Sequence, residues 1–352
     1  MSFSVKICGT AQSTLKSEEV CPPLSHRLTQ LGFVIEDNSQ KAEFFIGFNH
    51  DRDLYNSFSE NGGNPKNAAL IRLEPAAVFP AQYMNRVERL YGVIITPGSS
   101  TSLPTFPWPY YFNQNPLQPD VRAPSLESVV SDALRQNLFE PEQWGQRPIV
   151  VSLIASNKVS PSYKNNYKLR RKFARALPED ALQIYGGLWN SPLIDQLKHR
   201  AGVLSFALHS RFIPNLIEIY GKVFTKYPSA KGTVDDKHEI IEKSKFSLVI
   251  ENDNNYVSEK LIDALVGGSI PIYFGGDTQI TGIPKELVFT NLKNEVEVMN
   301  FIANFSEQDL LEFQLNLKQW LQSSAFHQLW AGDYVFASIA DEIAEKFRNV
   351  VP

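Results

Sequence analysis

Residues 246–276, FSLVIENDNNYVSEKLIDALVGGSIPIYFGG, constrain the fold of this chain more than any other segment. The segment opens with an apolar run typical of a buried strand, and residues 251–255 then form a polar loop. Ser258 is a favourable N-cap for an amphipathic helix, which the glycine pair at 267–268 should end. An apolar stretch over 269–274 predicts a second strand. The segment therefore predicts a strand–loop–helix–strand unit of an α/β sheet.

A polar loop and a helix N-terminus at the carboxyl end of a parallel strand form the place where open α/β sheets bind ligands. The plainer interpretation is an ordinary βαβ unit, in which an Asn-rich loop provides only turn and capping chemistry. The order of the polar residues along the segment favours the ligand-binding interpretation.

That order resembles the signature of the α-1,3/4-fucosyltransferase family. In the family, a strand ending Phe-x-x-x-x-Glu-Asn leads through a short loop to Tyr-x-Thr-Glu-Lys, and an apolar helix and Pro-(Ile/Val)-x-x-Gly follow. The matching positions here are Phe246, Glu251, Asn252, Tyr256, Glu259, Lys260, Pro271 and Gly275. This chain departs from the pattern in a shorter loop between Asn252 and Tyr256 and in Ser258, which replaces the usual threonine. Because of the shorter loop, a donor with a different sugar or a different base remains an alternative.

Composition limits the class of protein. A length of 352 residues fits two domains, and 43% hydrophobic with 20% charged residues excludes wholesale disorder. The net charge of −4 gives no basic field for nucleic acid. Cys8 and Cys21 are too few for a disulfide framework and lack metal-site spacing, so a reducing compartment is expected.

The first ten residues predict a strand and lack the apolar core of a signal peptide, and no run approaches the ~20 apolar residues of a membrane-spanning helix. Animal fucosyltransferases, by contrast, carry an N-terminal membrane anchor. We therefore expect a cytoplasmic enzyme of the bacterial soluble type, which could act peripherally at a membrane on a lipid-linked acceptor.

Strand and helix patterns alternate along both halves of the chain, which predicts an α/β fold with mainly parallel sheets. In the first half, strands are expected at 4–8, 33–36, 42–48, 68–74 and 91–96, with helices at 24–31, 79–90 and 125–137. In the second half, strands are expected at 148–156, 181–185, 246–250 and 269–274, with helices at 164–177 and 235–244 and a poorly periodic helical stretch over 193–220.

The polar stretch 140–147, with Pro141 and Pro148, marks the domain boundary. We expect an acceptor-side α/β domain over 1–143, a nucleotide-sugar-binding α/β domain over 148–330, and a C-terminal helix over 331–352 that packs back on the first domain. The GT-B arrangement of two Rossmann-like domains facing a central cleft is implied by the family resemblance.

The resemblance implies an inverting transfer of fucose from GDP-fucose to a hydroxyl of a glycan. For the leaving diphosphate, a basic helix offers Lys168, Arg170, Arg171, Lys172 and Arg175. The register of the family selects Arg170, whose planar fork suits phosphate oxygens, whereas most of the cluster is a solvated face. Lys260, at a helix N-terminus that already favours anions, is the second predicted cation.

By the same resemblance, Glu259 would accept hydrogen bonds from the ribose hydroxyls, with Asn252 and Tyr256 in the same pocket. A first-turn carboxylate that interacts with the helix dipole, and an interface tyrosine, are the plainer roles of Glu259 and Tyr256. Lys237 matches a recurring family lysine and is predicted to contact the nucleotide.

Glu74, which ends the strand pattern AALIRL before Pro75, is the predicted catalytic base, and its plainer role is loop hydrogen bonding. Glu36 and Asp37 are weaker candidates. The aromatic stretch 107–111 could stack against the acceptor or belong to a buried cluster.

The sequence predicts neither a metal site nor a cofactor. Asp51-Arg52-Asp53 spells the Asp-x-Asp pattern of metal-dependent glycosyltransferases, but three residues are weak evidence, and the histidines lack ligand spacing. Two alternatives to a fucosyltransferase remain, a transferase that uses another GDP- or NDP-sugar and a non-catalytic glycan-binding protein. The combination of Arg170, Glu259 and Lys260 argues against the second, because a binding protein has no need of cations directed at a phosphate.

Overall fold

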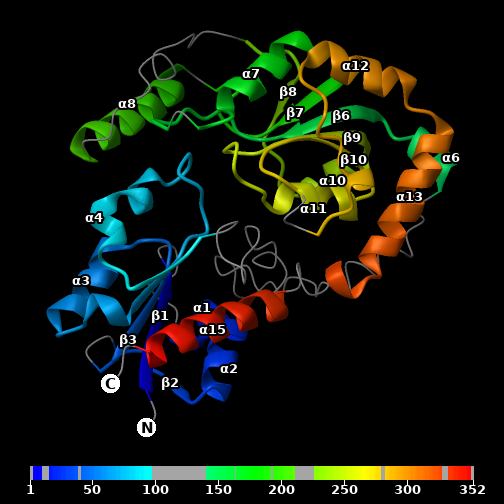
Figure 1. Ribbon diagram of the computed structural model, residues 1–352. Helices are drawn as coiled ribbons and strands as arrows, with labels where there is room; N and C mark the ends of the chain where they lie inside the picture. The colour runs from blue at the N-terminus through cyan, green and yellow to red at the C-terminus, as the bar shows by residue number, and fades with distance from the viewer. Residues whose placement is uncertain are drawn as a thin grey trace. The chain divides into compact units, whose positions relative to one another are not determined.

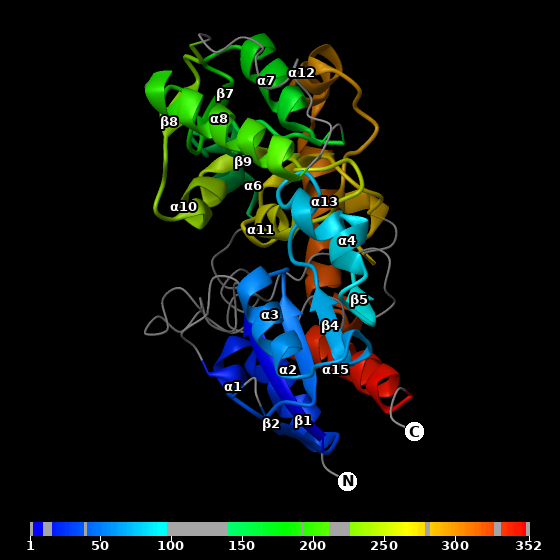
Figure 2. The same ribbon diagram turned by 90° about the vertical axis from the view of Figure 1, so that its left-hand side faces the viewer.

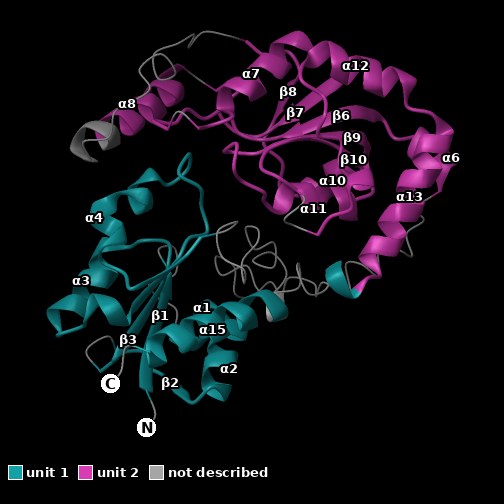
Figure 3. Ribbon diagram, in the orientation of Figure 1, with its two compact units in different colours: residues 1–126, 324–352 teal, residues 127–323 magenta. Residues whose placement is uncertain are grey.

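The chain folds into two compact units, residues 1–126 with 324–352 and residues 127–323 (Figure 3). The computed structural model describes residues 3–9, 16–38, 41–96, 140–162, 164–191, 193–210, 226–278, 282–326 and 332–349. Each unit contains a five-stranded sheet whose strand pairs are all parallel, which confirms the predicted α/β class (Figure 1).

The sheet of unit 1 has the strand order β2-β1-β3-β4-β5. Its strands are β1 (Phe3–Gly9), β2 (Phe33–Ile35), β3 (Phe44–Phe48), β4 (Ala68–Ile71) and β5 (Val93–Ile95). The helices among the described residues of this unit are α1 (Ser17–Val20), α2 (Pro22–Gln30), α3 (Arg52–Glu60), η1 (Pro65–Asn67), η2 (Pro80–Tyr83), α4 (Asn85–Glu88) and α15 (Gly332–Arg348). The strands are short and strongly apolar, as expected for a parallel sheet that is buried on both faces.

Alternate residues of the unit 1 strands supply two separate cores. Val5, Ile46 and Ile71 pack against α2 and α15, whereas Phe45 and Leu70 face Tyr55 and Phe58 of α3. Because side chains alternate along a strand, these two sets cover opposite faces of the sheet. Helices from the two ends of the chain thus cover one face together, and Figures 1 and 2 show α15 beside α2.

The C-terminal helix α15 is fixed in unit 1 by burial and by one exposed ion pair. Phe347 is 0% exposed, and its ring stacks on Phe44 with ring centroids 4.4 Å apart. Arg27 Nε lies 2.9 Å from Asp341 Oδ1, with both side chains substantially exposed. Exposed pairs contribute little, so the apolar face of the helix provides most of the attachment.

The sheet of unit 2 has the strand order β10-β9-β6-β7-β8. Its strands are β6 (Ile149–Ile154), β7 (Leu182–Tyr185), β8 (Ala230–Gly232), β9 (Ser244–Ile250) and β10 (Ile270–Phe274). The chain proceeds from β6 through β7 to β8 on one side, and then places β9 and β10 on the other side of β6. This reversal between β6 and β9 is a topological switch point, where the loops after two neighbouring strands diverge.

Helices join and cover the strands of unit 2. They are α6 (Pro141–Gly145), α7 (Tyr167–Ala176), α8 (Leu193–Ser210), α10 (Lys237–Glu242), α11 (Glu259–Val266), η5 (Lys285–Leu287), α12 (Glu295–Asn304) and α13 (Glu307–Leu321). Among the described residues of both units, no helix is long and apolar enough to span a bilayer.

Several sequence-based boundaries were wrong. The helix expected over 79–90 is instead a 3₁₀ turn, η2, and a single helical turn, α4, because Met84 between them has an extended backbone. The strand expected over 68–74 ends at Ile71, and α3 was not predicted. The poorly periodic helical stretch expected over 193–220 begins with the 18-residue helix α8. The helix expected over 125–137 and the aromatic stretch 107–111 lie outside the described residues.

We expect Phe347→Ala to destabilise unit 1 by about 3–5 kcal/mol, because it removes a fully buried ring between α15 and the sheet. Chemical unfolding of the full chain measures the loss. Lys346→Ala is the matched control, since its side chain is 49% exposed and forms only an i,i+4 pair with Glu342. Equal stability of the two variants would show that the attachment of α15 does not rest on its apolar face.

Candidate functional site

The candidate site lies at the carboxyl end of β9, beside the switch point in the sheet of unit 2. The loop 251–258 leaves β9 there and enters α11, and the loop after β6 diverges from it in the other direction. Asn254 and Asn255 are exposed, whereas Asn252, Glu259 and Lys260 are half-buried. Five of the six residues predicted to bind the donor nucleotide are therefore on or directly beneath one loop: Arg170, Asn252, Tyr256, Glu259 and Lys260.

Glu251 is the buried anchor of this loop. Its carboxylate is 0% exposed and accepts hydrogen bonds from the Ser258 backbone N–H at 2.7 Å and from the Ser258 hydroxyl at 2.7 Å. Lys260 Nζ donates to the same carboxylate at 3.2 Å. The carboxylate thus closes the loop onto the first turn of α11, where negative charge is favoured by the helix dipole. Ser258 is the N-cap of that helix, as predicted.

A glycine pair after β10 allows the loop to pack closely against the sheet. A Cβ on Gly275 would lie 2.5 Å from Glu251 Cγ, and one on Gly276 would lie 2.8 Å from the Tyr256 backbone nitrogen. Gly276 N donates to the Tyr256 carbonyl at 2.9 Å, and the Tyr273 hydroxyl donates to the same carbonyl at 3.0 Å. Tyr256 is consequently only 5% exposed, and its backbone is fixed from two sides.

The glycine pair at 267–268 ends α11 in the way the sequence predicts. Gly268 has a φ of 66°, its N–H donates to Leu265 O, and Ser269 N donates to Ala264 O at 2.9 Å. These two bonds form a Schellman motif, which requires a left-handed residue at this position. The motif turns the chain directly into β10 and so fixes the length of α11.

Arg170 of α7 is buried, and its hydrogen bonds link the end of β9 to the loop after β6. It is 2% exposed, and its Nη2 donates to Ile250 O at 2.7 Å and to Asn252 Oδ1 at 2.8 Å. Its Nη1 reaches Ser156 O, after β6, at a longer 3.4 Å. Burial lowers the pKa of Arg170, with Tyr167 and Glu251 opposing the effect. Its guanidinium therefore orients Asn252 and holds the end of β9.

The neighbouring basic residues of α7 differ in their surroundings. Lys168 is exposed, and Lys172 Nζ pairs with Glu295 Oε2 of α12 at 2.9 Å. Arg171 Nη1 donates to Lys158 O at 2.9 Å and to Asn157 Oδ1 at 3.2 Å in the loop after β6. The expectation of a mostly solvated cluster is thus correct for Lys168, Lys172 and Arg175, which are exposed, whereas Arg171 is half-buried.

Glu259 and Lys260 present opposite charges at the first turn of α11. Burial alone would raise the pKa of the Glu259 carboxyl, but the ammonium groups of Lys260 and Lys237, with the Ser258 hydroxyl and the backbone, hold it below its ordinary value. The Lys260 ammonium also lies 5.9 Å from the centroid of the Tyr256 ring. The site therefore combines an ionised carboxylate with a cation whose side chain is 22% exposed.

Lys237 lies on α10, outside the loop, and has a buried partner. Its Nζ is 2.6 Å from Asp263 Oδ2, and the Asp263 side chain is 2% exposed. Asp263 was not predicted, because 26 residues separate it from Lys237 and no local pattern pairs them. The pair attaches α10 to α11, the helix whose first turn carries Glu259 and Lys260.

Glu74, the predicted base, lies in unit 1, three residues beyond the end of β4, and its side chain is half-buried. Its backbone carbonyl accepts hydrogen bonds from Gln82 Nε2 at 2.8 Å and the Tyr83 hydroxyl at 2.9 Å. The Glu36 and Asp37 side chains accept bonds from backbone N–H groups of Asn38 and Ser17. The loop that carries Glu74 is thus fixed through its backbone.

The Asp-x-Asp pattern has a structural role in this chain. Asp51 is the N-cap of α3, and its carboxylate accepts hydrogen bonds from the backbone N–H groups of Asp53 and Leu54. Among the described residues, no group of three or more His, Cys, Asp or Glu side chains is arranged to hold a metal ion. Cys8 and Cys21 are buried free thiols, and burial raises the pKa of Cys8 to about 12.

Glu259→Gln should lower the free energy of unfolding at neutral pH. The difference in this free energy between the variant and the unmodified chain should become smaller as the pH falls below 4.5, the ordinary pKa of the group. The pKa of Glu259 is depressed in the folded state, so its ionisation stabilises the fold above the ordinary value and is lost as the pH falls through the folded value. Urea unfolding over this range measures the effect, with Glu307→Gln, an exposed first-turn glutamate of α13, as control. A pH-independent difference would exclude the charge of Glu259 as the cause.

No protein-family model and no curated protein sequence matches this chain. Its structure is similar to the crystal structure of an α1,3-fucosyltransferase over 98% of this chain and 91% of that chain, with a TM-score of 0.52 and 16% sequence identity. The crystal structure of an α1,3-fucosyltransferase with GDP-fucose aligns at a TM-score of 0.45 and 14% identity, over the same shares of both chains. Anabaena HepE in complex with UDP and glucose aligns over 97% of this chain and 99% of that chain, at a TM-score of 0.49 and 10% identity. The similarity to the first structure confirms the expected fold: this chain has the two-unit α/β GT-B fold, which it shares with an α1,3-fucosyltransferase.

Proposed function

We propose that this protein is a glycosyltransferase that moves fucose from GDP-fucose to a hydroxyl of a glycan, with inversion at the anomeric carbon. One observation carries the proposal. The polar residues of the fucosyltransferase-like signature, from Glu251 to Lys260, lie together in one hydrogen-bonded loop and the first turn of α11, at the topological switch point of unit 2. Ligands of open parallel sheets bind at such a point.

The donor would occupy the edge formed by this loop and the first turn of α11. The half-buried Glu259 carboxylate, kept ionised by its neighbours, would accept hydrogen bonds from the ribose hydroxyls. Asn252, already oriented by Arg170, and the fixed Tyr256 would complete the nucleoside pocket. Lys237 would act on the same pocket through its ion pair with Asp263 on α11 and through its field on Glu259.

The diphosphate would bind at the N-terminus of α11, where the helix dipole favours an anion. Lys260 Nζ would donate hydrogen bonds to the phosphate oxygens and weaken its hydrogen bond to Glu251. Arg170 would contribute from behind Asn252, since its longest hydrogen bond, from Nη1 to Ser156 O, is the one most easily exchanged for a phosphate oxygen. This positive charge stabilises the leaving GDP, so the proposal requires neither a metal nor a cofactor.

In the transfer step, Glu74 would take the proton of the acceptor hydroxyl while the oxygen of that hydroxyl attacks the anomeric carbon of the fucose. The bond from that carbon to the β-phosphate oxygen breaks on the opposite side, and GDP leaves with the electron pair. A single displacement of this kind inverts the anomeric configuration. The acceptor would be a glycan, which could be lipid-linked, and the enzyme would act in the cytoplasm or peripherally at a membrane.

GDP should raise the melting temperature of the protein more than UDP, CMP or ADP at equal concentration, because a ligand at about 100 Kd adds about 2.7 kcal/mol of apparent stability. Differential scanning fluorimetry measures the shifts. Lys260→Ala should weaken the GDP shift, whereas Lys168→Ala, which removes an exposed lysine of α7, should not. A larger shift with UDP would contradict GDP-fucose as the donor and favour a transferase for another nucleotide sugar.

Glu74→Gln should lower turnover by ~10²-fold or more, the usual size of a general-base loss, while leaving the GDP-induced melting shift unchanged. Release of GDP from GDP-fucose in the presence of an acceptor glycan measures turnover. The same loss after Glu36→Gln or Asp37→Asn, with Glu74→Gln unaffected, would place the base on the loop after β2. An unmodified protein that binds GDP and glycans but never releases GDP would be a non-catalytic glycan-binding protein.

A further inference from the structure

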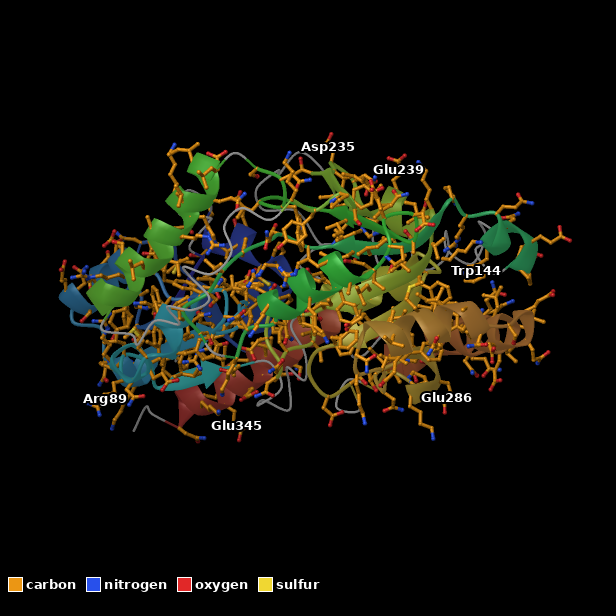
Figure 4. The ribbon with its side chains drawn as sticks, turned by 90° about the horizontal axis from the view of Figure 1, so that it is seen from above. Arg89, Trp144, Asp235, Glu239, Glu286 and Glu345 are labelled. Atoms are coloured by element: carbon orange, nitrogen blue, oxygen red, sulfur yellow. The ribbon has the colours of Figure 1, made fainter. Side chains whose placement is uncertain are left out.

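A pocket of about 380 Å³ lies within unit 2 between η5, α12 and α13, away from the loop at the end of β9. Its lining is aromatic and acidic, and consists of Glu286, Phe289, Phe301, Asn304, Phe305, Asp309, Glu312, Phe313 and Asn316. This volume is in the range of pockets that bind small molecules. Glu286, labelled in Figure 4, lies at the outer surface of the unit.

The floor of the pocket is a cluster of phenylalanine rings. The ring centroids of Phe289 and Phe301 are 4.6 Å apart, and those of Phe301 and Phe305 are 5.4 Å apart. Phe289, Phe301 and Phe305 are half-buried, so part of each ring remains accessible, whereas Phe313 is 3% exposed. Phe305 also contacts Phe246, near the start of β9, and the cluster thereby reaches toward the end of the strand opposite to Glu251.

The rim of the pocket carries only negative charge. Glu286, Asp309 and Glu312 contribute three carboxylates, and none of the lining residues is Lys, Arg or His. Asp309 is held in place by the N–H and hydroxyl of Ser306, which also lower the pKa of its carboxyl. Lys285 Nζ lies 4.0 Å from Glu286 Oε1, but the Lys285 side chain is 87% exposed and is not part of the lining.

We propose that this pocket binds a small organic ammonium ion, with its apolar groups on the phenylalanine rings and its positive charge toward the carboxylates of the rim. Aromatic faces attract cations through the ring quadrupole, and quaternary ammonium groups are recognised in this way by aromatic pockets. An anion would be repelled by three carboxylates, and a purely apolar ligand would leave them without a counter-charge. Asn304 and Asn316 could hydrogen-bond a hydroxyl on the same ligand.

The inference is independent of the proposed transfer reaction, because the pocket shares no residue with the candidate donor site. Choline is a suitable probe, and 3,3-dimethylbutan-1-ol is its neutral control, since carbon replaces nitrogen in an otherwise matching shape. Isothermal titration calorimetry on the full chain should show that choline binds at least about tenfold more tightly than the alcohol. Choline affinity should fall with added salt, because the rim charges are accessible to solvent.

Three variants assign the binding to this pocket. Phe305→Leu keeps apolar volume but removes a ring, and should weaken choline about two- to fivefold without weakening the alcohol. Glu312→Gln should weaken choline by a similar factor, about two- to fivefold, whereas Glu307→Gln, on the same helix but outside the lining, should have no effect. Thermal unfolding of each variant confirms that it is folded. Equal binding of choline and the alcohol, no binding of choline, or equal effects of Glu307→Gln and Glu312→Gln would overturn the proposal.

Discussion

Two buried charges beneath one loop determine the shape of the candidate site. Glu251 is 0% exposed and Arg170 is 2% exposed, and a charge buried to this extent is tolerated only when its hydrogen-bonding groups are satisfied. Glu251 uses Ser258 and Lys260, and Arg170 uses Ile250, Asn252 and Ser156. Removal of either charge would leave its partners unsatisfied, so the two together enforce a single conformation of the loop between β9 and α11. The closely packed glycines 275 and 276 then allow this conformation to rest against the end of β10.

Apolar core positions and buried polar groups differ in the substitutions that they accept. The structural similarity to an α1,3-fucosyltransferase coexists with only 16% identity. Core positions accept many apolar combinations of similar volume. A buried carboxylate that serves a backbone N–H, a hydroxyl and an ammonium group together accepts almost no substitute.

The same contrast decides what could be predicted from the sequence. The strand–loop–helix–strand unit at 246–276, its N-cap Ser258 and its glycine stop follow from local chemistry, and they were predicted correctly. The ties between distant segments were not. Arg170 was selected by the family register, but its bonds to Ile250 and Asn252, about eighty residues away, leave no local trace. Asp263 was missed because 26 residues separate it from Lys237 and no local pattern pairs them. Asp51 was weighed as part of a metal-binding pattern, although a carboxylate directly before a helix is equally the pattern of an N-cap.

Because Lys260 and Arg170 already have protein partners, an anion would bind this site by exchange of hydrogen bonds and not by neutralising free cations. Each bond given to a phosphate oxygen would be withdrawn from Glu251 or from the end of β6, so the net gain from charge would be small. The discrimination between donors would then depend on side chains that are not held by such hydrogen bonds within the protein. Asn254 and Asn255 are the exposed residues of the loop, and they lie in the segment that is shortened relative to the fucosyltransferase signature. If the donor binds as proposed, the length of this loop, more than the cations beneath it, determines which nucleotide sugar fits.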